Sequence, residues 1–469
     1  MSKISAMLDT GKRSLMNSQT SLQTVAHNIA NKSTEGFSRQ RVEILSNVPI
    51  TEGNLQIGMG ARAGVVTRVN NPWLEKQIQR EGTSMGYQDA RAEALGRVEQ
   101  VYNEQNNKGL NQYMTDFFNS FRELSNNPES LASRTMVRES AVSMTKDFQR
   151  VVGQLHDVQA DINGQIGNTV GEINQMSKEI ASLNEKIQTV EVQGVPANDE
   201  RDRRELLLKK LGEKVDITWA EGRDGMVTVN AGRTALLVSG IGSMELKAQK
   251  LDGGEKVQVF FTGTGSAPAN ITEQITGGRL GGSLEVRDHV IEDLLHHVDT
   301  MAYAVAKEVN TAHVEGFDKS GKPGVLFFDM PDQVAGAAGT LGLNKTVFND
   351  VGRIAAGAKS GAPGDNSVAN VISSIQYRQV MDDGRSTLDD YYNTQVGEIG
   401  TVAQRAVKAQ ESQKNVMSQL NNIRESVSGV SLDEETTKMV EFQKAYEASA
   451  RLIKVADELF DTILNLKRL

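Results

Sequence analysis

Apolar side chains recur at alternating intervals of three and four residues along the N-terminal segment, the spacing of a helix that presents one apolar stripe. Two small residues, Gly11 and Ser18, interrupt the stripe; they permit a close approach of another helix but bury little surface. We therefore predict a helix that is weak alone and needs a partner helix. The larger apolar members of the stripe are Ile4, Leu8, Leu15, Leu22, Val25 and Ile29.

The C-terminal segment carries a matching stripe with the same spacing. Ser431 and Glu434 stand three residues apart at its start, which is the pattern of a capping box that opens a helix. We predict that this helix and the N-terminal helix pair as a coiled coil. The large apolar members of the second stripe are Met439, Phe442, Tyr446, Ile453, Phe460 and Ile463.

Helical spacing also dominates the interior of the chain. The longest run extends from Met144 to Val190, about four times the length of an ordinary globular helix. Asn126-Asn127-Pro128 precedes it as a break, and the Gly-, Ala- and Asn-rich residues 316–366 predict a looser connector. The predicted interior helices cover residues 72–105, 110–125, 144–190, 199–212, 284–313, 367–381 and 388–428.

One region departs from the helical pattern. Alternating apolar and polar residues predict strands at 215–220, 226–230, 235–238 and 257–262, and Asp224-Gly225 is a hairpin turn signal. The sequence therefore predicts a mainly α fold with an inserted β domain, in which long terminal coiled-coil helices and a helical bundle draw on both chain ends. The predicted domains are 1–40 with 430–469 (axial coiled coil), 41–212 with 281–429 (mainly helical) and 213–280 (β).

Composition narrows the possible functions. Only 5% of the 469 residues are aromatic, which fits long, thin helical packing better than the core of a large enzyme. The net charge of −9 argues against nucleic acid as a partner. The chain shows neither an apolar run long enough to span a bilayer nor the apolar region of a secretory signal, and it has no cysteine. We therefore expect that the chain does not insert into a membrane. If it is exported, we expect a route that does not use a cleavable signal.

Candidate chemistry is sparse. One cluster could suggest a metal: His296, His297 and Asp299, with Asp293 and His313 nearby. Asp293 and His297 share a face of a helix, but adjacent histidines point about 100° apart and cannot both join them. A histidine at the edge of a helical bundle is the better interpretation. The glycine pairs within 277–282 lack the residues of a phosphate-binding loop, and no serine has the setting of a catalytic nucleophile. We predict no enzyme activity, no metal and no cofactor.

Residues 27–42, HNIANKSTEGFSRQRV, closely resemble the signature that ends the first helix in the bacterial flagellar axial family of rod, hook and hook-associated proteins. Asn28 and Asn31 can close the helix with local side-chain hydrogen bonds, and Gly36 permits a positive φ. The family usually has proline and tyrosine around this glycine, whereas this chain has Glu35 and Phe37.

Further stretches carry the same resemblance. Residues 428–460 resemble the C-terminal helix of the family, and the paired acids after Ser431-Leu432-Asp433 favour the hook-associated proteins over hook and rod proteins. Interior stretches at 198–207, 280–288 and 309–318 agree. The similarity thus covers most of the chain and is weakest across the predicted β domain.

The resemblance implies a secreted structural protein of the bacterial flagellum, needed for motility and exported unfolded by the flagellar type III apparatus. It would assemble as a ring at the junction between hook and filament through its terminal helices, which are expected to be disordered in the free monomer. The implied partners are hook protein, a second junction protein of the hook-associated group, and an export chaperone that holds the C-terminal helix. Two alternatives stay open: another axial subunit of hook or rod type, and a coiled-coil fibre or adhesin protein.

Overall fold

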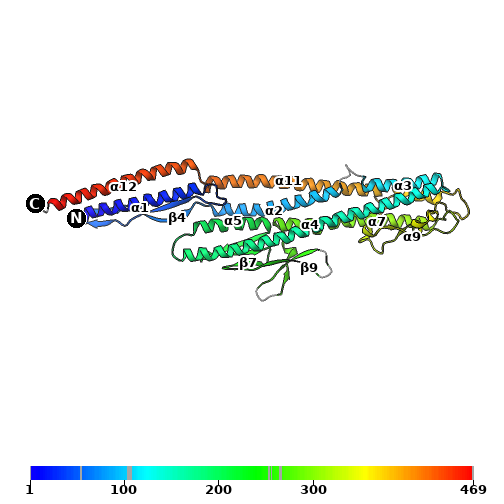
Figure 1. Cartoon of the computed structure of the whole chain (residues 1–469), viewed down its shortest axis with the longest axis horizontal. Coiled ribbons are helices and arrows are strands. Elements are labelled where there is room, and N and C mark those ends of the chain that lie inside the picture. The colour runs from blue at the N-terminus through cyan, green and yellow to red at the C-terminus, as the bar shows by residue number, and fades with distance from the viewer. Residues whose placement is uncertain are drawn as a thin grey trace.

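The computed structural model describes residues 2–52, 55–102, 108–251, 254, 256–263 and 267–466. The molecule is long and narrow, its long helices run roughly along its length, and both chain termini lie at the same end (Figure 1). This is the predicted mainly α fold with an inserted β region. Within the described ranges, no helix is long and apolar enough to cross a membrane.

The two terminal helices lie side by side at one end of the molecule. Helix α1 (Ser2–Ala30) contacts helix α12 (Leu432–Leu466) more extensively than any other pair of elements contact each other in the described chain. The helices are antiparallel, because Ser14 is paired with Ser449 near their middle whereas Asn28, close to the end of α1, is bonded to Glu435 at the start of α12. The predicted pairing of the two chain ends is confirmed, and it occurs within one chain.

A two-stranded ribbon that we did not predict lies against α1. Strands β1 (Gln40–Ser46) and β4 (Ala61–Arg68) are antiparallel, and β2 (Ile50–Glu52) and β3 (Leu55–Ile57) continue the ribbon toward its tip. The side chain of Asn17 fixes the ribbon on α1, since its amide donates to Ala61 O (2.9 Å) and its oxygen accepts from Ala63 N (2.6 Å).

The middle of the molecule is a bundle of long helices. The bundle consists of α2 (Pro72–Val101), α3 (Leu110–Asn126), α4 (Leu131–Glu191), α5 (Asn198–Lys214) and α11 (Leu388–Ser428). The predicted start of α4 at Met144 was too late, because the Ser130 side chain caps the helix by accepting from Ser133 N. The predicted end of α2 at 105 lies outside the described residues.

The β region packs on α4. One sheet has the order β5 (Ile217–Glu221), β6 (Val227–Ala231), β7 (Ala235–Ser239), β8 (Gly242–Ser243), and the other has the order β11 (Ala269–Asn270), β10 (Val257–Phe261), β9 (Leu246–Lys250). Buried Asn184 of α4 donates to Val227 O and accepts from Val227 N, so one helix residue completes the hydrogen bonding of a strand. Gly225, in the predicted hairpin turn, has a φ of +77°.

The chain returns to the bundle through α6 (Gly278–Glu285), a π-helical turn (Val286–Val290) and α7 (Ile291–Val314). A Cβ on Gly282 would overlap the carbonyl oxygen of Tyr87, so glycine lets α6 lie directly against α2. Gly278, with a φ of +68°, likewise lies directly against the backbone of Lys214 and Val215, so both glycine pairs allow close backbone packing. The predicted start of this helix at Leu284 was too late, and the last residues of the predicted β segment are helical.

The end of the molecule far from the termini is built from short elements. They are β12 (Phe328–Asp329), α8 (Ala337–Thr340), β13 (Gly342–Leu343), α9 (Lys345–Asn349) and α10 (Ser367–Ser374), with single 3₁₀ turns at Val351–Arg353 and Ile375–Tyr377. A further 3₁₀ turn, Thr272–Gln274, follows β11 in the β region. The predicted helix 367–381 was wrong beyond Tyr377, since Arg378 is extended (φ −83°, ψ 143°) and Met381 forms a β-bridge with Ser386. A fully buried cluster joins this end to the bundle: Phe117, Phe118, Phe121, Phe327 and Phe328.

Candidate assembly interface

Helices α1 and α12 approach each other at small residues. A Cβ on Gly11 would lie 2.8 Å from Cγ1 of Ile453, and the hydroxyl of Ser449 donates to that of Ser14 over 2.7 Å. Ala456 is fully buried in the same contact region of α12. Small side chains thus bring the two backbones together, as the interruptions of the N-terminal stripe suggested.

The large apolar residues of the two stripes are used only in part. Of the predicted interface residues, Val25 alone is fully enclosed, whereas Met439, Tyr446 and Ile463 are exposed. The pairing of α1 with α12 within one chain therefore leaves apolar surface on both helices. The partly buried members are Ile4, Leu8, Leu15, Leu22, Ile29, Phe442, Ile453 and Phe460.

The turn after α1 ties three elements together through one buried side chain. The Asn28 amide donates to Gln40 O and to Glu435 Oε2, both over 2.9 Å, and Asn28 Oδ1 accepts from Gln40 N over 2.9 Å. The end of α1, the first residue of β1 and the start of α12 consequently move as one unit. These hydrogen bonds are the structural role of Asn28 in the signature.

The other signature residues shape the turn itself. The Asn31 amide donates to His27 O over 3.1 Å and closes the helix, and Gly36 has a φ of +81°, where a side chain would be strained. The ring of Phe37 packs edge-on against that of His27, with centroids 5.5 Å apart. Phe37 therefore holds the turn by packing.

The paired acids at the start of α12 bind the same turn. Glu435 is 1% exposed and accepts from Arg39 Nε over 2.8 Å, and Glu434 pairs with Arg39 Nη1 over 2.9 Å. The backbone N–H of Arg39 also donates to Ser428 O at the end of α11. Arg39 thus links the N-terminal turn to both C-terminal helices.

Asp202 of α5 anchors the turn to the helical bundle. Its carboxylate accepts from the backbone N–H of Ser38 over 2.8 Å and from Arg68 Nη1 over 2.7 Å. Burial raises the pKa of Asp202, and the Arg68 charge opposes that shift. Arg68 therefore favours the charged form of the carboxylate, and together they fix the turn and the base of the ribbon on α5.

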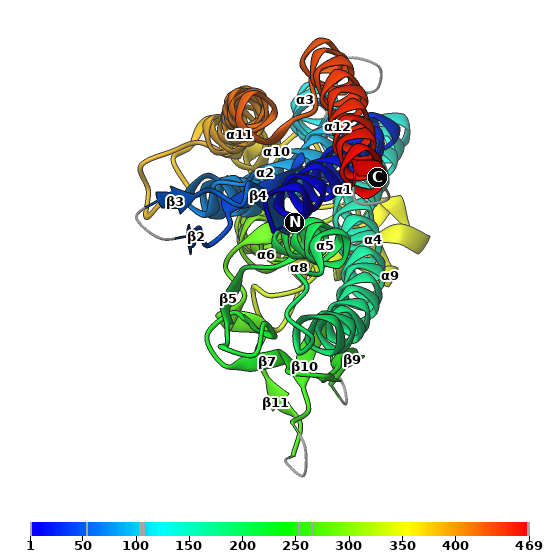
Figure 2. The ribbon, with the colours of Figure 1, turned by 90° about the vertical axis from the view of Figure 1, so that its left-hand side faces the viewer.

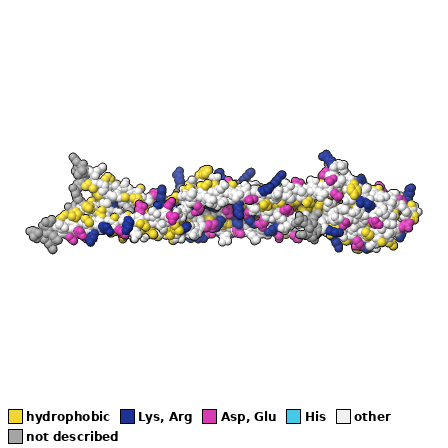
Figure 3. Space-filling model, turned by 90° about the horizontal axis from the view of Figure 1, so that it is seen from above, with side chains coloured by type: hydrophobic (Ala, Val, Ile, Leu, Met, Phe, Trp, Pro, Cys, Tyr) yellow, Lys and Arg dark blue, Asp and Glu magenta, His cyan; other side chains and the backbone are white. Residues whose placement is uncertain are grey.

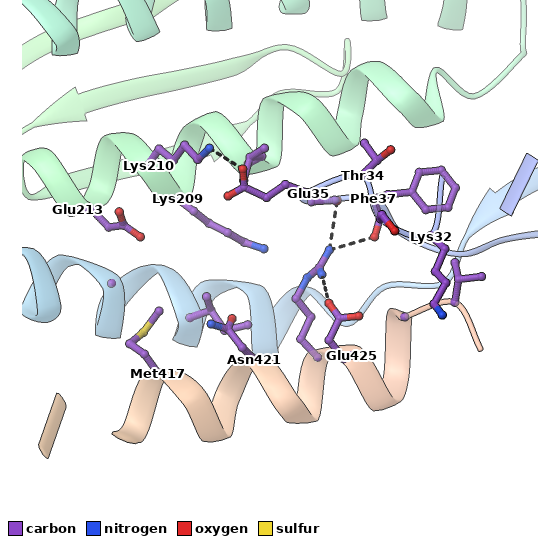
Figure 4. Close-up of a pocket in the computed structure, with 18 residues that line it drawn as sticks. Lys32, Thr34, Glu35, Phe37, Lys209, Lys210, Glu213, Met417, Asn421 and Glu425 are labelled. Atoms are coloured by element: carbon purple, nitrogen blue, oxygen red, sulfur yellow. Dashed lines mark hydrogen bonds and ion pairs between the residues drawn. The ribbon is translucent and has the colours of Figure 1, made fainter. Parts of the chain in front are cut away.

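A cavity of about 480 Å³ lies where the turn meets α2, α5 and α11 (Figure 4). Arg424 reaches across it, with Nε 3.1 Å from Glu75 and Nη2 donating to Gly36 O over 3.1 Å. Glu75 also pairs with Lys209, and Lys210 pairs with Glu35 over 2.8 Å. Most charges around the cavity are matched, which suits a structural joint between the terminal helices and the bundle.

The joint residues were not identified from the sequence. Asp202 and Glu435 fall within stretches that carry the family resemblance, and that resemblance was the available signal. Each stands among other charged residues, so no local pattern marks it. Glu75 and Arg424 are 349 residues apart, and no local pattern links them.

One member of the histidine pair has a protein partner. His297 Nδ1 lies 2.6 Å from the hydroxyl of Tyr391, and burial together with the neighbouring His296 lowers the pKa of His297. In the part of the chain that the structure describes, no three His, Cys, Asp or Glu side chains are grouped as a metal would require.

Comparison with known proteins gives the family. Flagellar hook-associated protein 1 of Bacillus subtilis (strain 168) is 30% identical over a match that covers 98% of this chain and 97% of the relative. The chain belongs to the flagellar hook-associated protein 1 family. The protein of the same name from Escherichia coli (strain K12) is 23% identical, with 99% and 100% of the two chains covered.

Two family models match separate parts of this family member. The helical domain of flagellar hook-associated protein FlgK matches residues 95–328, and the C-terminal region of the flagellar basal body rod FlgEFG proteins matches 425–466, which includes α12. The flagellar hook junction protein FlgK from Burkholderia pseudomallei has the same fold, with a TM-score of 0.68, 15% identity, and coverage of 75% of this chain and 100% of that one. The resemblance inferred from the sequence is confirmed.

Proposed function

We propose that this chain is a structural subunit of the bacterial flagellum that forms the junction between hook and filament. The observation that carries the proposal is the pairing of the two chain ends into an axial unit, α1 with α12, that still exposes apolar side chains. A subunit of this shape can assemble with copies of itself through its ends while the bundle stays outside the contact. The family membership supports the same role.

The assembly interface that we propose is made by the apolar residues of the two terminal helices. Three of them, Met439, Tyr446 and Ile463 of α12, are exposed. The members that are partly or fully buried within the described chain are Ile4, Leu8, Leu15, Leu22, Val25, Ile29, Phe442, Ile453 and Phe460. Exposed apolar side chains in rows along a helix are the usual mark of a surface that another molecule covers.

The proposed partners are further copies of this chain in a ring, hook protein and a second junction protein of the hook-associated group. An export chaperone that covers α12 before assembly is part of the same proposal, because the exposed apolar residues of α12 need cover before assembly. The protein would act outside the cell as part of the flagellum. We propose no catalytic role, cofactor or metal.

We also propose a three-part division of the chain: terminal helices 1–40 with 430–469, helical residues 41–212 with 281–429, and β residues 213–280. Asn17 of α1 attaches the ribbon 40–68, which falls almost entirely in the helical part of this division, to the terminal helices through Ala61 and Ala63.

Electron microscopy of isolated flagella that carry an epitope-labelled chain tests the function. The label is expected at the hook–filament junction. Label along the hook or rod would reassign the chain to another axial position, and loss of filament in a strain that lacks the chain should be restored by the labelled protein.

A further inference from the structure

The terminal helices and the ribbon are tied to one another and are joined to the bundle by little covalent chain. We call α1, the turn 31–39, the ribbon 40–68 and α12 the terminal unit. Asn28 joins α1, β1 and α12, and Asn17 holds the ribbon on α1. The terminal unit extends beyond the end of the bundle (Figure 1) and ends in two arms that spread apart (Figure 3). Two short connections, residues 69–71 and 429–431, lead from it into the bundle.

The apolar core of the bundle does not continue into the terminal unit. The buried residues of that core lie between Ala92 and Ala406, and a smaller cluster lies on α2 and α11; among the described residues, neither cluster includes a member of the terminal unit. Leu206 of α5 touches the turn at Gly36, and the cavity of about 480 Å³ lies beside that contact. Two parts of a chain that do not share a large apolar interface are expected to move relative to each other.

Polar side chains on one face of α5 contact the base of the terminal unit. Asn198 donates to Val66 O over 2.7 Å, and Asp199 accepts from Gln40 Nε2 over 2.7 Å. Seen from the chain ends, α5 lies below α1 and α12 lies above it (Figure 2). The four polar residues of this face lie within about 120° around the helix. They are Asn198, Asp199, Asp202 and Glu205.

Arg68, the last residue of β4, lies at the centre of this contact. Its Nη1 is 2.7 Å from Asp202 Oδ1 and 3.0 Å from Glu205 Oε2. The turn is also held by Arg424 and Lys210, whose long side chains have rotamers that can change as the turn moves. Neither covalent connection between the terminal unit and the bundle involves α5. The contacts with α5 can therefore open while the terminal unit stays attached.

We propose that α5 and Arg68 form a lock, and that the terminal unit swings away from α5 as a rigid body when the lock opens. The connections 69–71 and 429–431 form the hinge, because short segments between elements usually absorb the backbone changes of a hinge motion. The cavity under the turn leaves room for the movement. Such a joint lets one chain set its terminal helices at more than one angle to its bundle. The inference concerns the single chain and goes beyond its place in an assembly.

Distances between pairs of spin labels in the purified full-length chain test the lock, and the absence of native cysteine simplifies the labelling. Gln19→Cys on α1 with Ser182→Cys on α4 spans the lock. Gln19→Cys with Gln443→Cys on α12 lies within the terminal unit, and all three sites are exposed. Double electron–electron resonance measures the distribution of each distance. We expect a narrow distribution for both pairs in the chain that is otherwise unmodified.

Arg68→Glu should open the lock, because it places a third carboxylate beside Asp202 and Glu205. The distance across the lock should become longer and more broadly distributed, whereas the distance within the terminal unit should not change. Arg62→Glu is the matched control, since Arg62 is exposed on the same strand and has no ion pair among the described residues. It should leave both distributions unchanged.

Asp202→Lys opens the lock from the side of α5, because it sets a second positive charge beside Arg68. Its control is Glu179→Lys, which breaks the ion pair of α4 with Arg203 of α5 outside the lock. The proposal is overturned by an unchanged distance across the lock in both Arg68→Glu and Asp202→Lys, and equally by the same lengthening in the controls. A broad distribution within the terminal unit also overturns it, since the terminal helices would then come apart instead of swinging together.

Discussion

The backbone of Gly11 passes so close to Ile453 that a Cβ on Gly11 would lie 2.8 Å from Cγ1 of the isoleucine. The contact pairs one end of the chain with the other, and a glycine is what permits it. Helix α1 is correspondingly weak by itself, since glycine costs about 1 kcal/mol in a helix relative to alanine. The stability of the paired terminal helices therefore depends on the close packing of α1 against α12.

Replacement of Gly11 by leucine should separate α1 from α12 although leucine favours helix more than glycine does. We expect faster amide exchange in both terminal helices, loss of filament growth and an unchanged melting temperature of the bundle. Gly167→Leu is the control, because Gly167 lies in α4 with open space where a Cβ would be added. Equal filament growth in both variants would contradict the importance of the close approach.

A charge in the contact between the terminal helices should block assembly. Phe442→Asp and Ile453→Asp each place a carboxylate in a half-buried apolar position, which costs about 2 kcal/mol or more unless the helices separate. Thermal melting paired with a filament-growth assay measures the effect. Val440→Asp is the control, since Val440 is 53% exposed and points about 140° away from Ile453 and 160° away from Phe442 around α12. An Ile453→Asp variant that still supports filament growth would remove α12 from the interface.

The long helices could be predicted because their signal is local. Helix α11 matches its predicted range of 388–428, and the seams of α1 and α12 were visible as runs of three- and four-residue spacing. The paired small residues Gly11 and Ser18 even indicated where the helices approach. Periodicity shows that a face is apolar, but it does not show how much of that face the partner covers.

The ribbon 40–68 could not be predicted by the same means. Its period of two is broken by an irregularity between Val42 and Ile44, and its apolar residues are mostly exposed, so inward and outward positions do not contrast. The joint between the turn after α1 and the helical bundle could not be predicted for a different reason. Glu75, Arg424 and Lys209 form ion pairs between α2, α11 and α5, which only the folded chain brings together.

Acid should weaken the end of the molecule far from the termini through His313. Its ring is fully buried, accepts from Ala355 N over 2.8 Å and lies with Nδ1 2.5 Å from Val325 O. Burial is the main cause that lowers the pKa of His313 from 6.5 to about 4, and the charges of Arg134 and Arg353 add to it.

The unfolded chain therefore binds a proton near pH 6.5 that the folded chain resists until about pH 4. The contribution of His313 to stability is complete above pH 6.5, and it falls by about 3 kcal/mol as the pH drops to 4. Urea denaturation at pH 6.5 and at pH 4 measures this loss in the free energy of unfolding. His313→Gln should flatten this dependence, whereas the exposed His289→Gln should not; an unchanged slope in His313→Gln would contradict the assignment.

Loss of the Asn28 side chain should loosen the joint between α1, the ribbon and α12. Asn28→Ala leaves the buried N–H and C=O of Gln40 and the carboxylate of Glu435 each without one partner, which should cost about 2–4 kcal/mol locally. Asn28→Asp should cost more, because a carboxylate would face Gln40 O and Glu435. Asn31→Ala is the control, since Asn31 is only partly buried and the hydrogen bonds of its side-chain amide are confined to the turn.

Amide exchange of residues 28–40 and 432–440 should accelerate in both Asn28 variants and stay near wild type in Asn31→Ala. Because Glu435 would keep Arg39 in every variant, acceleration confined to 28–40 would mean that Arg39, and not Asn28, holds α12 at the turn.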